Sequence, residues 1–338
     1  MLDPAVHGPL GFARPVPRDG YAWWYVDAIS DDGRYGLTII GFIGSVFSPY
    51  YARARRRGRG DPANHVAMNV VLTGPRGGRW CMTERRTAAL AVTPDTLAIG
   101  PSAMTWDGQG LTVEIAEWAV PLPRRVCGTV RVRPAAITAA SPVLDRDGRH
   151  RWWPIAPLSR VEVELTEPAL RWSGTGYLDS NHGAEPMERA FTHWDWCRGV
   201  LPGTGSGARG DRAVILYNPS WRGAGERADG GHDGTGRAIA LTVDAQGRVD
   251  PVDPPPRAGL PPCFWWRVAR ETRCDADAGS SNGARVRETL VDAPFYARSV
   301  IDTWLLGQPV TAMHESLDLD RFDTAWVQAL LPFRMPRV

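Results

Sequence analysis

The sequence predicts an all-β protein, and three observations lead to this prediction. Short runs of β-branched, aromatic and aliphatic residues recur along the whole chain. The 36 glycines and 29 prolines fall largely between these runs and would interrupt a long helix. No long stretch keeps the hydrophobic period of an amphipathic helix. Short strands at such regular spacing are typical of β-sandwiches and β-barrels.

The first strands form a predicted hairpin. Residues 21–28 are aromatic and β-branched, residues 30–34 have the Asp and Gly of a turn, and residues 35–46 are apolar again. Further strand-like runs lie at residues 65–72, 80–83, 90–99, 103–106, 111–118, 125–134, 161–165, 170–177, 191–197, 213–217, 238–243, 264–268 and 285–291. Two segments are predicted loops: residues 199–236 are Gly-rich around one short strand, and residues 249–262 are Pro-rich.

The length of 338 residues suits two domains of ordinary size. The segment WWPIAPLSR has two prolines before a new strand, as a linker would. We therefore expect an N-terminal β domain over residues 15–157 and a C-terminal β domain over residues 158–338.

Composition excludes several classes of protein. Hydrophobic residues make up 43% and charged residues 22%, so the chain can build a core. No window has 18 uninterrupted apolar residues, which argues against a transmembrane helix. The first 20 residues lack a charged start followed by an apolar stretch, which favours a cytoplasmic chain over a secreted one. The formal charge of +2 predicts no nucleic-acid partner.

The sequence offers no familiar metal or hydrolase motif. The five cysteines are odd in number, widely spaced and free of C-x-x-C, so we expect buried thiols and neither a disulfide framework nor structural zinc. None of the seven histidines pairs at metal-ligand spacing. The absence of G-x-S-x-G, H-E-x-x-H and phosphate-loop patterns argues against the hydrolase, zinc-protease and NTPase classes.

An arginine run follows an aromatic segment at residues 47–51. Cations beside aromatics can dock on an anionic membrane surface, or they can form a solvated loop, and the pattern leaves both readings open. The run consists of Arg53, Arg55, Arg56, Arg57 and Arg59.

The region most informative for chemistry is residues 150–196, which contains HRWWP, GTGYLDSNHG and FTHWDW. In an extended chain, residues i and i+2 face the same side, so His150 projects with Trp152, and Tyr177 with Asp179. A carboxylic acid can protonate an apolar substrate, and aromatic faces stabilise the resulting cation. The alternative is structural: Asp179 closes a turn and the aromatics fill a core. Spacing alone favours that alternative.

Longer motifs change this balance. The chain resembles the carotenoid 1,2-hydratase family, also called hydroxyneurosporene synthase, over about residues 20–200. The matching pieces are YAWWYVDAISDDGRYGLTIIGFIGSVFSPYY, DPANHVAMNVVLTGP, RWCMTER, HRWWPIAP, GTGYLDSNHG and HWDW.

The resemblance implies two linked lipocalin-like β domains with a ligand cavity at or near their junction. It implies a hydro-lyase that adds water to the terminal C1=C2 bond of acyclic carotenoids such as neurosporene and lycopene, giving a tertiary alcohol. No cofactor is implied, and no metal.

The family's motif residues carry over to Asp179 as proton donor, Tyr177, and the His-x-Trp pair of His150 and Trp152. Asp179 would protonate C2, leaving a tertiary cation at C1 to which water adds. A free Asp titrates near pH 3.9, so a neutral acid at pH 7 requires surroundings that disfavour the carboxylate by about 4 kcal/mol. Trp152 and Tyr177 would hold the cation. His150 is expected to be neutral, and either bonds Asp179 or orients the water.

The candidate substrate-binding residues come from two aromatic strands. Alternation places the rival acid Asp195 with His193, opposite to Trp194 and Trp196. Core packing is the alternative for the aromatics of the first strand, where Asp27 is expected to be a structural acceptor. The candidates are Trp23, Trp24, Tyr25, Trp194, Asp195 and Trp196.

An acyclic carotenoid resides in a bilayer, so we expect a peripheral enzyme on the cytoplasmic side of the inner or photosynthetic membrane. Two other functions remain open. Lipocalin-like folds commonly hold apolar ligands without chemistry, which would make the protein a carrier. An acid with aromatics would also serve a cyclase or a pericyclic enzyme acting on polyene or polyketide substrates.

Overall fold

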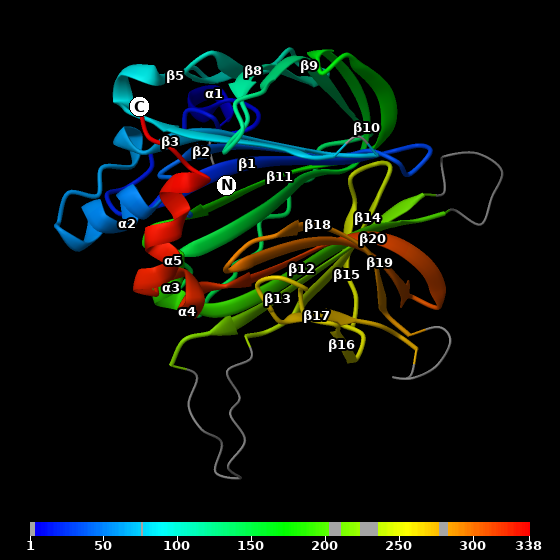
Figure 1. The fold of residues 1–338 in the computed structure, drawn as a ribbon. Helices are drawn as coiled ribbons and strands as arrows, with labels where there is room; N and C mark the ends of the chain where they lie inside the picture. Colours follow the sequence, from blue (N-terminus) through cyan, green and yellow to red (C-terminus); the bar gives the residue numbers. More distant parts are fainter. Residues whose placement is uncertain (1–3, 76, 203–210, 224–235, 277–282) are drawn as a thin grey trace. The chain divides into compact units, whose positions relative to one another are not determined.

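The computed structural model describes residues 4–75, 77–202, 211–223, 236–276 and 283–338, and it confirms the all-β prediction (Figure 1). Its strands pair antiparallel in sheets of eleven, seven and two strands. The chain divides into two compact units. Unit 1 holds the described residues of 1–143, 147–186 and 328–338, and unit 2 those of 144–146 and 187–327.

Unit 1 contains the eleven-stranded sheet. Its strands are β1 (Tyr21–Ser30), β2 (Gly36–Ile43), β3 (Val66–Thr73), β4 (Arg79–Arg85), β5 (Leu90–Val92), β6 (Thr96–Ile99), β7 (Ser102–Trp106), β8 (Leu111–Trp118), β9 (Arg125–Pro134), β10 (His150–Glu167) and β11 (Leu170–Gly183). Its helical turns are α1 (Pro4–His7), α2 (Pro49–Arg56), η1 (Pro62–Asn64), η2 (Thr87–Ala89) and η4 (Leu331–Phe333).

The predicted first hairpin is confirmed. Strands β1 and β2 pair antiparallel, from Ala22 opposite Ile43 to Ile29 opposite Gly36. The turn closes where the Ser30 amide donates to the Tyr35 carbonyl at 2.9 Å. Gly33 has a φ of 68°, a left-handed conformation that favours glycine in such turns.

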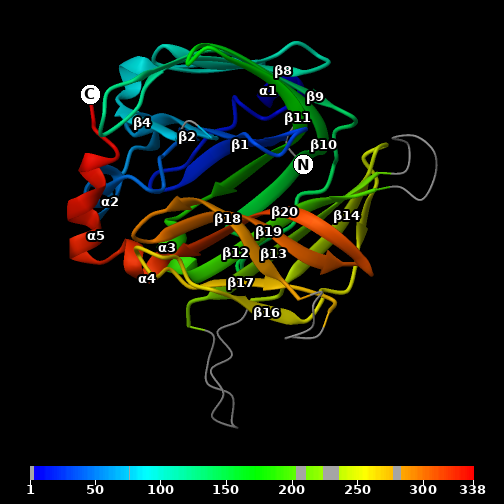
Figure 2. The same cartoon turned by 45° about the vertical axis from the view of Figure 1, so that its right-hand side comes forward.

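The sheet of unit 1 curves back on itself (Figure 2). Its strand order is β4-β3-β2-β1-β11-β10-β9-β8-β7-β6-β5. A bridge between Cys81 and Ala119 joins β4 to the segment after β8, so the sheet is nearly closed and barrel-like. Apolar residues at alternate positions fill its inner side. They include Trp24, Val26, Ile39, Met68, Met104, Val113, Val130, Val163 and Leu178.

The boundary predicted between residues 157 and 158 is corrected by the structure. That position lies inside β10, a single strand of 18 residues, and the two units divide after residue 186. The Pro-containing segment is not a linker. Proline cannot donate to a strand ladder, and the β10–β11 register shifts between Trp153 and Ala156 and again between Ala156 and Ser159, where Pro154 and Pro157 lie.

Unit 2 contains the seven-stranded sheet, in the order β15-β14-β13-β12-β20-β19-β18, and the small β16–β17 sheet. Its strands are β12 (Phe191–Leu201), β13 (Arg212–Trp221), β14 (Ile239–Asp244), β15 (Val249–Pro251), β16 (Arg257–Leu260), β17 (Arg270–Arg273), β18 (Arg285–Asp292), β19 (Tyr296–Leu305) and β20 (Gln308–Asp318). Helices α3 (Met187–Ala190) and α4 (Leu319–Phe322) belong to it, and α5 (Ala325–Leu330) crosses the boundary at residue 327.

The predicted loops differ in outcome. The Pro-rich residues 249–262 contain the short strands β15 and β16. Of the predicted Gly-rich loop, residues 203–210 and 224–235 lie outside the described part of the chain. The five cysteines are free, as predicted, and four of them are buried. None of the helices in the described ranges has the length and apolar character needed to cross a membrane.

Candidate active site

Three neighbouring strands of unit 1 bring the motif residues onto one face of the sheet. Strand β11 lies between β1 and β10. The register places Tyr25 opposite Asp179, and places Trp23 and Trp152 on either side of Asn181. Because side chains alternate along a strand, these residues project to the side away from the apolar core of unit 1.

Asp179 accepts two hydrogen bonds on the same oxygen. The Tyr177 hydroxyl donates to Asp179 Oδ2 at 2.8 Å, and the Trp152 indole N–H donates to it at 2.9 Å. The indole N–H also lies 3.2 Å from the Tyr177 hydroxyl oxygen. All three side chains are buried. The structure thus joins the predicted acid, phenol and indole in one hydrogen-bonded cluster.

Burial and the neighbouring Asp179 carboxylate hold the pKa of Tyr177 well above its ordinary value of 10. Tyr177 therefore keeps its proton near neutral pH and acts as a donor to Asp179. The two donors at Oδ2 stabilise the negative charge of the Asp179 carboxylate once the acid has lost its proton.

Aromatic rings surround the acid. The Tyr25 ring lies edge-on to the Tyr177 ring, with centroids 6.1 Å apart. Further along β1, Trp23 stacks on Tyr21 at 5.0 Å and meets the edge of Phe42 at 6.1 Å. Directly opposed side chains of antiparallel strands lie about 5 Å apart, so Tyr25 is a close neighbour of Asp179.

His150 lies on the same face but away from the acid. The register places it opposite Gly183, four residues beyond Asp179, which is about 13 Å along the strand. Its Nδ1 lies 2.8 Å from the Tyr21 hydroxyl oxygen, and its Nε2 lies 3.7 Å from Glu185 Oε1. This separation excludes the predicted direct hydrogen bond from His150 to Asp179 in this geometry.

Trp24, one of the substrate-binding candidates, does not lie on this face. It is fully buried among the core residues of unit 1. Its ring packs against Phe12 at 5.2 Å, and its indole N–H donates to the Leu10 carbonyl at 2.8 Å. The reason is alternation: Trp24 points opposite to Trp23 and Tyr25.

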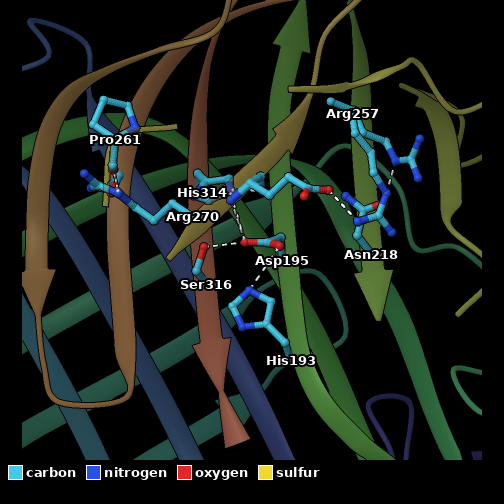
Figure 3. Close-up of polar contacts among 11 residues, drawn as sticks. His193, Asp195, Asn218, Arg257, Pro261, Arg270, His314 and Ser316 are labelled. Atoms are coloured by element: carbon cyan, nitrogen blue, oxygen red, sulfur yellow. Dashed lines mark hydrogen bonds and ion pairs between the residues drawn. The ribbon is translucent and has the colours of Figure 1, made fainter. Parts of the chain in front are cut away.

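Asp195 lies in unit 2, in a separate polar cluster (Figure 3). Its Oδ2 lies 3.3 Å from His193 Nε2, and its Oδ1 accepts from the Ser316 hydroxyl and, at 3.2 Å, from the Glu271 amide. His314 Nε2 lies 3.8 Å from Oδ1. The predicted shared face of His193 and Asp195 is confirmed. Burial opposes a charged His193, but the hydrogen bond and charge of Asp195 raise the pKa of His193 above its ordinary value.

Trp194 and Trp196 lie on the other side of β12, as alternation predicts. Trp194 meets the edges of Phe191 at 5.5 Å and Tyr217 at 5.4 Å. Both tryptophans are buried. Strand β12 thus presents an acid to one side and two indoles to the other.

Three residues on the face that carries Asp179 were not predicted as site residues from the sequence: Tyr21, Asn181 and Asp27. Asp27 is buried directly opposite Tyr177. The signal was present, because period-two alternation along YAWWYVDA puts Tyr21, Trp23, Tyr25 and Asp27 on one side. Across the described ranges, the structure gathers no group of three His, Cys, Asp or Glu side chains suited to a metal ion.

The chain is similar to proteins named acyclic carotenoid 1,2-hydratase. It is 53% identical to that of Thiocapsa roseopersicina over 99% of this chain and 77% of the relative. It is 46% identical to that of Rubrivivax gelatinosus over 98% of this chain and 76% of the relative. The Cereibacter sphaeroides protein is 40% identical over 88% of this chain and 98% of the relative.

Two solved structures share the fold at low sequence identity. An AttH protein from Nitrosomonas europaea superposes with a TM-score of 0.56 at 14% identity, over 89% of this chain and 92% of that chain. Kievitone hydratase from Nectria haematococca has a TM-score of 0.51 at 11% identity, over 91% of this chain and 92% of that chain. The sequence profile described as carotenoid hydratase CrtC matches residues 39–338, and on this match and the identities above the chain belongs to the carotenoid hydratase CrtC family.

Proposed function

We propose that this protein is an acyclic carotenoid 1,2-hydratase with Asp179 as its acid. The observation that carries the proposal is the buried Asp179 carboxyl, held by Trp152 and Tyr177 and facing Tyr25. The names of the relatives at 53% and 46% identity support the substrate class and the reaction.

The hydrogen bonds suggest which oxygen delivers the proton. Oδ2 already accepts from Trp152 and Tyr177. The acid proton is therefore placed on Oδ1. The C1=C2 π electrons take this proton to form a C2–H bond, which leaves a tertiary cation at C1. The carboxylate formed at Asp179 keeps two donors, and this stabilises the product of proton transfer.

Aromatic rings then hold the cation until water attacks. Tyr25, Tyr177 and Trp152 come from three adjacent strands and supply aromatic rings whose π faces can stabilise a cation in a buried setting. Water forms the C1–O bond, and its surplus proton returns to the Asp179 carboxylate. The cycle adds one water molecule to the carotenoid without net oxidation or reduction, so the reaction needs no electron donor or acceptor.

His150 is assigned a positioning role. His150 is the first residue of β10, where it lies opposite Gly183 and contacts Tyr21. These contacts hold the start of β10, and with it Trp152, in register with β11. A neutral imidazole suits a site that forms a cation, because a second positive charge nearby would oppose the step.

Isotope labelling tests the reaction. Detergent-dispersed lycopene or neurosporene is converted in H2¹⁸O and, separately, in D2O. We expect one ¹⁸O at C1 and one non-exchanging deuterium at C2. Asp179→Asn should lower turnover at least 100-fold while folded, since general acid catalysis contributes roughly that factor or more. Asp195→Asn tests the rival acid in the same assay, because it replaces a buried aspartate of the other unit.

Each other outcome points elsewhere. Turnover lost in Asp195→Asn but kept in Asp179→Asn would transfer the acid role to Asp195. Carotenoid binding by the wild-type protein with no alcohol would favour a carrier. A rearranged product without ¹⁸O would favour a cyclase or a pericyclic enzyme.

We further propose that α2 and the residues after it contact membrane lipid. The arginine run lies in α2 and in the residues that follow it. The N-terminus of α2 is capped by Ser48, whose Oγ accepts a hydrogen bond from the Tyr51 amide at 2.9 Å. Arg55 is buried over the Tyr51 ring and does not take part. The exposed cations of this patch are Arg53, Arg56, Arg57 and Arg59.

Half-buried Phe47 and Tyr50 adjoin these cations, a combination typical of membrane interfaces. Flotation with phosphatidylcholine vesicles with and without 30% phosphatidylglycerol tests the proposal. Binding should require the anionic lipid and fall in the triple variant Arg56→Gln, Arg57→Gln, Arg59→Gln. Equal flotation of the variant would contradict it.

A further inference from the structure

Unit 1 contains a cavity of about 660 Å³ that the proposed hydration does not use. Its walls come from the N-terminal segment, from the connection between β9 and β10, from the start of β10 and from the end of β11. A second cavity of about 280 Å³ shares Arg14, Arg151 and His182 with it. The combined space suits an organic ligand rather than a single ion.

The cavity lies on the opposite side of the sheet from Asp179. Arg151 and His182 are direct partners in the β10–β11 register, next to the pair formed by Trp152 and Asn181. Alternation sends the first pair to the cavity and the second pair to the acid face. A ligand here would be separated from the proposed active site by the sheet itself.

Two arginines, Arg14 and Arg151, line this cavity together with His182. Arg14 Nε and Nη1 and His182 Nδ1 are buried and have no hydrogen-bond partner among the described residues. None of the described residues that line either cavity is Asp or Glu. An unsatisfied buried donor is costly, so these atoms point to an acceptor that the chain does not supply.

Electrostatics support the same conclusion. Burial, with the Arg151 cation, lowers the pKa of Arg14 to about 10, and burial with the Arg14 and Arg151 cations lowers the pKa of His182 to about 3. At neutral pH Arg14 is charged and His182 is a neutral donor or acceptor. An anion beside them would relieve both the repulsion and the desolvation.

Much of the rest of the wall is apolar, and Thr138 and Ser141 add two hydroxyl groups. Ile137 and Trp153 face the cavity, together with Pro9 and Ala139. The Trp153 ring is fixed because its indole N–H donates to the Thr138 carbonyl at 2.9 Å. The cavity therefore offers a cationic end and an apolar wall, which together match an amphiphile.

We propose that this cavity binds a single-chain amphiphile with an oxyanion head group, carboxylate or phosphate. The head accepts hydrogen bonds from Arg14, with Arg151 and His182 beside it, and the chain lies along Ile137 and Trp153. The site is independent of the proposed hydration and would stand if that proposal failed.

Calorimetric titration of the full chain tests the site with three ligands of one chain length. Laurate and dodecyl phosphate are used below their micelle concentrations, and dodecanol below its solubility limit. We expect at least one anionic ligand to bind, and dodecanol to bind at least 10-fold more weakly. Comparing laurate with dodecyl phosphate identifies the head group. Arg14→Gln should weaken the anionic ligand by roughly 10- to 100-fold, the range for a hydrogen bond to a charged group.

Two further variants keep the test decisive. Arg171→Gln is the control, because that arginine is highly exposed and, among the described residues, forms its ion pair with the partly exposed Glu164. Arg151→Gln changes an exposed residue and serves if Arg14→Gln does not fold. Equal binding of dodecanol, no binding of either anion, or full affinity in the folded Arg14 or Arg151 variants would overturn the proposal.

Discussion

The Tyr177 hydroxyl lies 2.8 Å from Oδ2 of Asp179, two residues further along β11 and on the same side of the strand. Both side chains are buried, so water does not compete for this hydrogen bond. Because Tyr177 keeps its proton near neutral pH, the bond has one direction, from phenol to carboxyl.

Tyr177→Phe should lower kcat for hydration by roughly 10- to 100-fold, because a hydrogen bond to a charged group contributes about 1.5–3 kcal/mol. The ring is retained, so KM should change little. Steady-state kinetics on dispersed lycopene checks this. Tyr35→Phe is the control. Tyr35 lies in the turn between β1 and β2, away from the acid, and its ring stacks on Trp172 of β11. An unchanged kcat in Tyr177→Phe would remove Tyr177 from the mechanism.

Trp152→Phe should also lower kcat, by about 10-fold or more, because it removes the second donor to Asp179 and keeps an aromatic face. The double variant with Tyr177→Phe should cost less than the product of the two single effects, since both donors serve one oxygen. Kinetic double-mutant analysis measures this coupling. Strict additivity would mean that the two donors act independently.

Trp24 should affect stability rather than substrate binding. Trp24→Ala is expected to destabilise unit 1 by about 3–5 kcal/mol, the usual cost of removing a buried aromatic ring. Trp118→Ala, at a tryptophan that is 53% exposed, should cost far less. Denaturant unfolding compares the two, and carotenoid titration of Trp24→Phe tests binding. Weakened binding in a stable Trp24→Phe would return Trp24 to the substrate site.

The sequence was most informative where alternation was unbroken. The period-two pattern predicted that His150 shares a face with Trp152 and that Tyr177 shares one with Asp179, and it separated Asp195 from Trp194 and Trp196. It also contained the evidence against Trp24, which stands between Trp23 and Tyr25 and must face the other way.

What the sequence could not show was long-range geometry. The prolines at 154 and 157 look like a linker in isolation, and only pairing with β11 shows that they occupy bulges in one long strand. The distance from His150 to Asp179 depends on the β10–β11 register, which no local pattern fixes. The place of Arg14 in the cavity wall depends on segments that meet only in the folded chain.

Stability should depend on pH through His193. Asp195 raises the pKa of His193, so the stability from this pair is fully present below about pH 6.5 and is lost as pH rises through the folded value. The difference in thermal midpoint between the wild type and His193→Gln should shrink above pH 6.5. In Asp195→Asn the same substitution should show no such trend. For His314 the direction is opposite. Burial lowers the pKa of His314, so protonation of His314 destabilises the folded protein as the pH falls.

A final prediction concerns the C-terminal residues of unit 1. The Glu84 carboxylate is fully buried, and the Arg337 guanidinium contacts its Oε1 while donating to the Asn64 carbonyl at 2.9 Å. His65 Nδ1 also lies 2.8 Å from Oε1, but burial and the Arg337 charge lower the pKa of His65 to about 4. His65 is therefore neutral near pH 7, and Arg337 supplies the compensating charge.

Arg337→Ala should destabilise the protein by about 3–5 kcal/mol, because it leaves a buried carboxylate without its cation. Adding Glu84→Gln should recover much of this loss, since the buried charge is then removed. Arg133→Ala is the control: its ion pair with Glu162 is exposed and should contribute at most about 1 kcal/mol. Denaturant unfolding of the four proteins decides the matter. If Arg337→Ala costs no more than Arg133→Ala, or Glu84→Gln gives no recovery, Arg337 does not compensate Glu84.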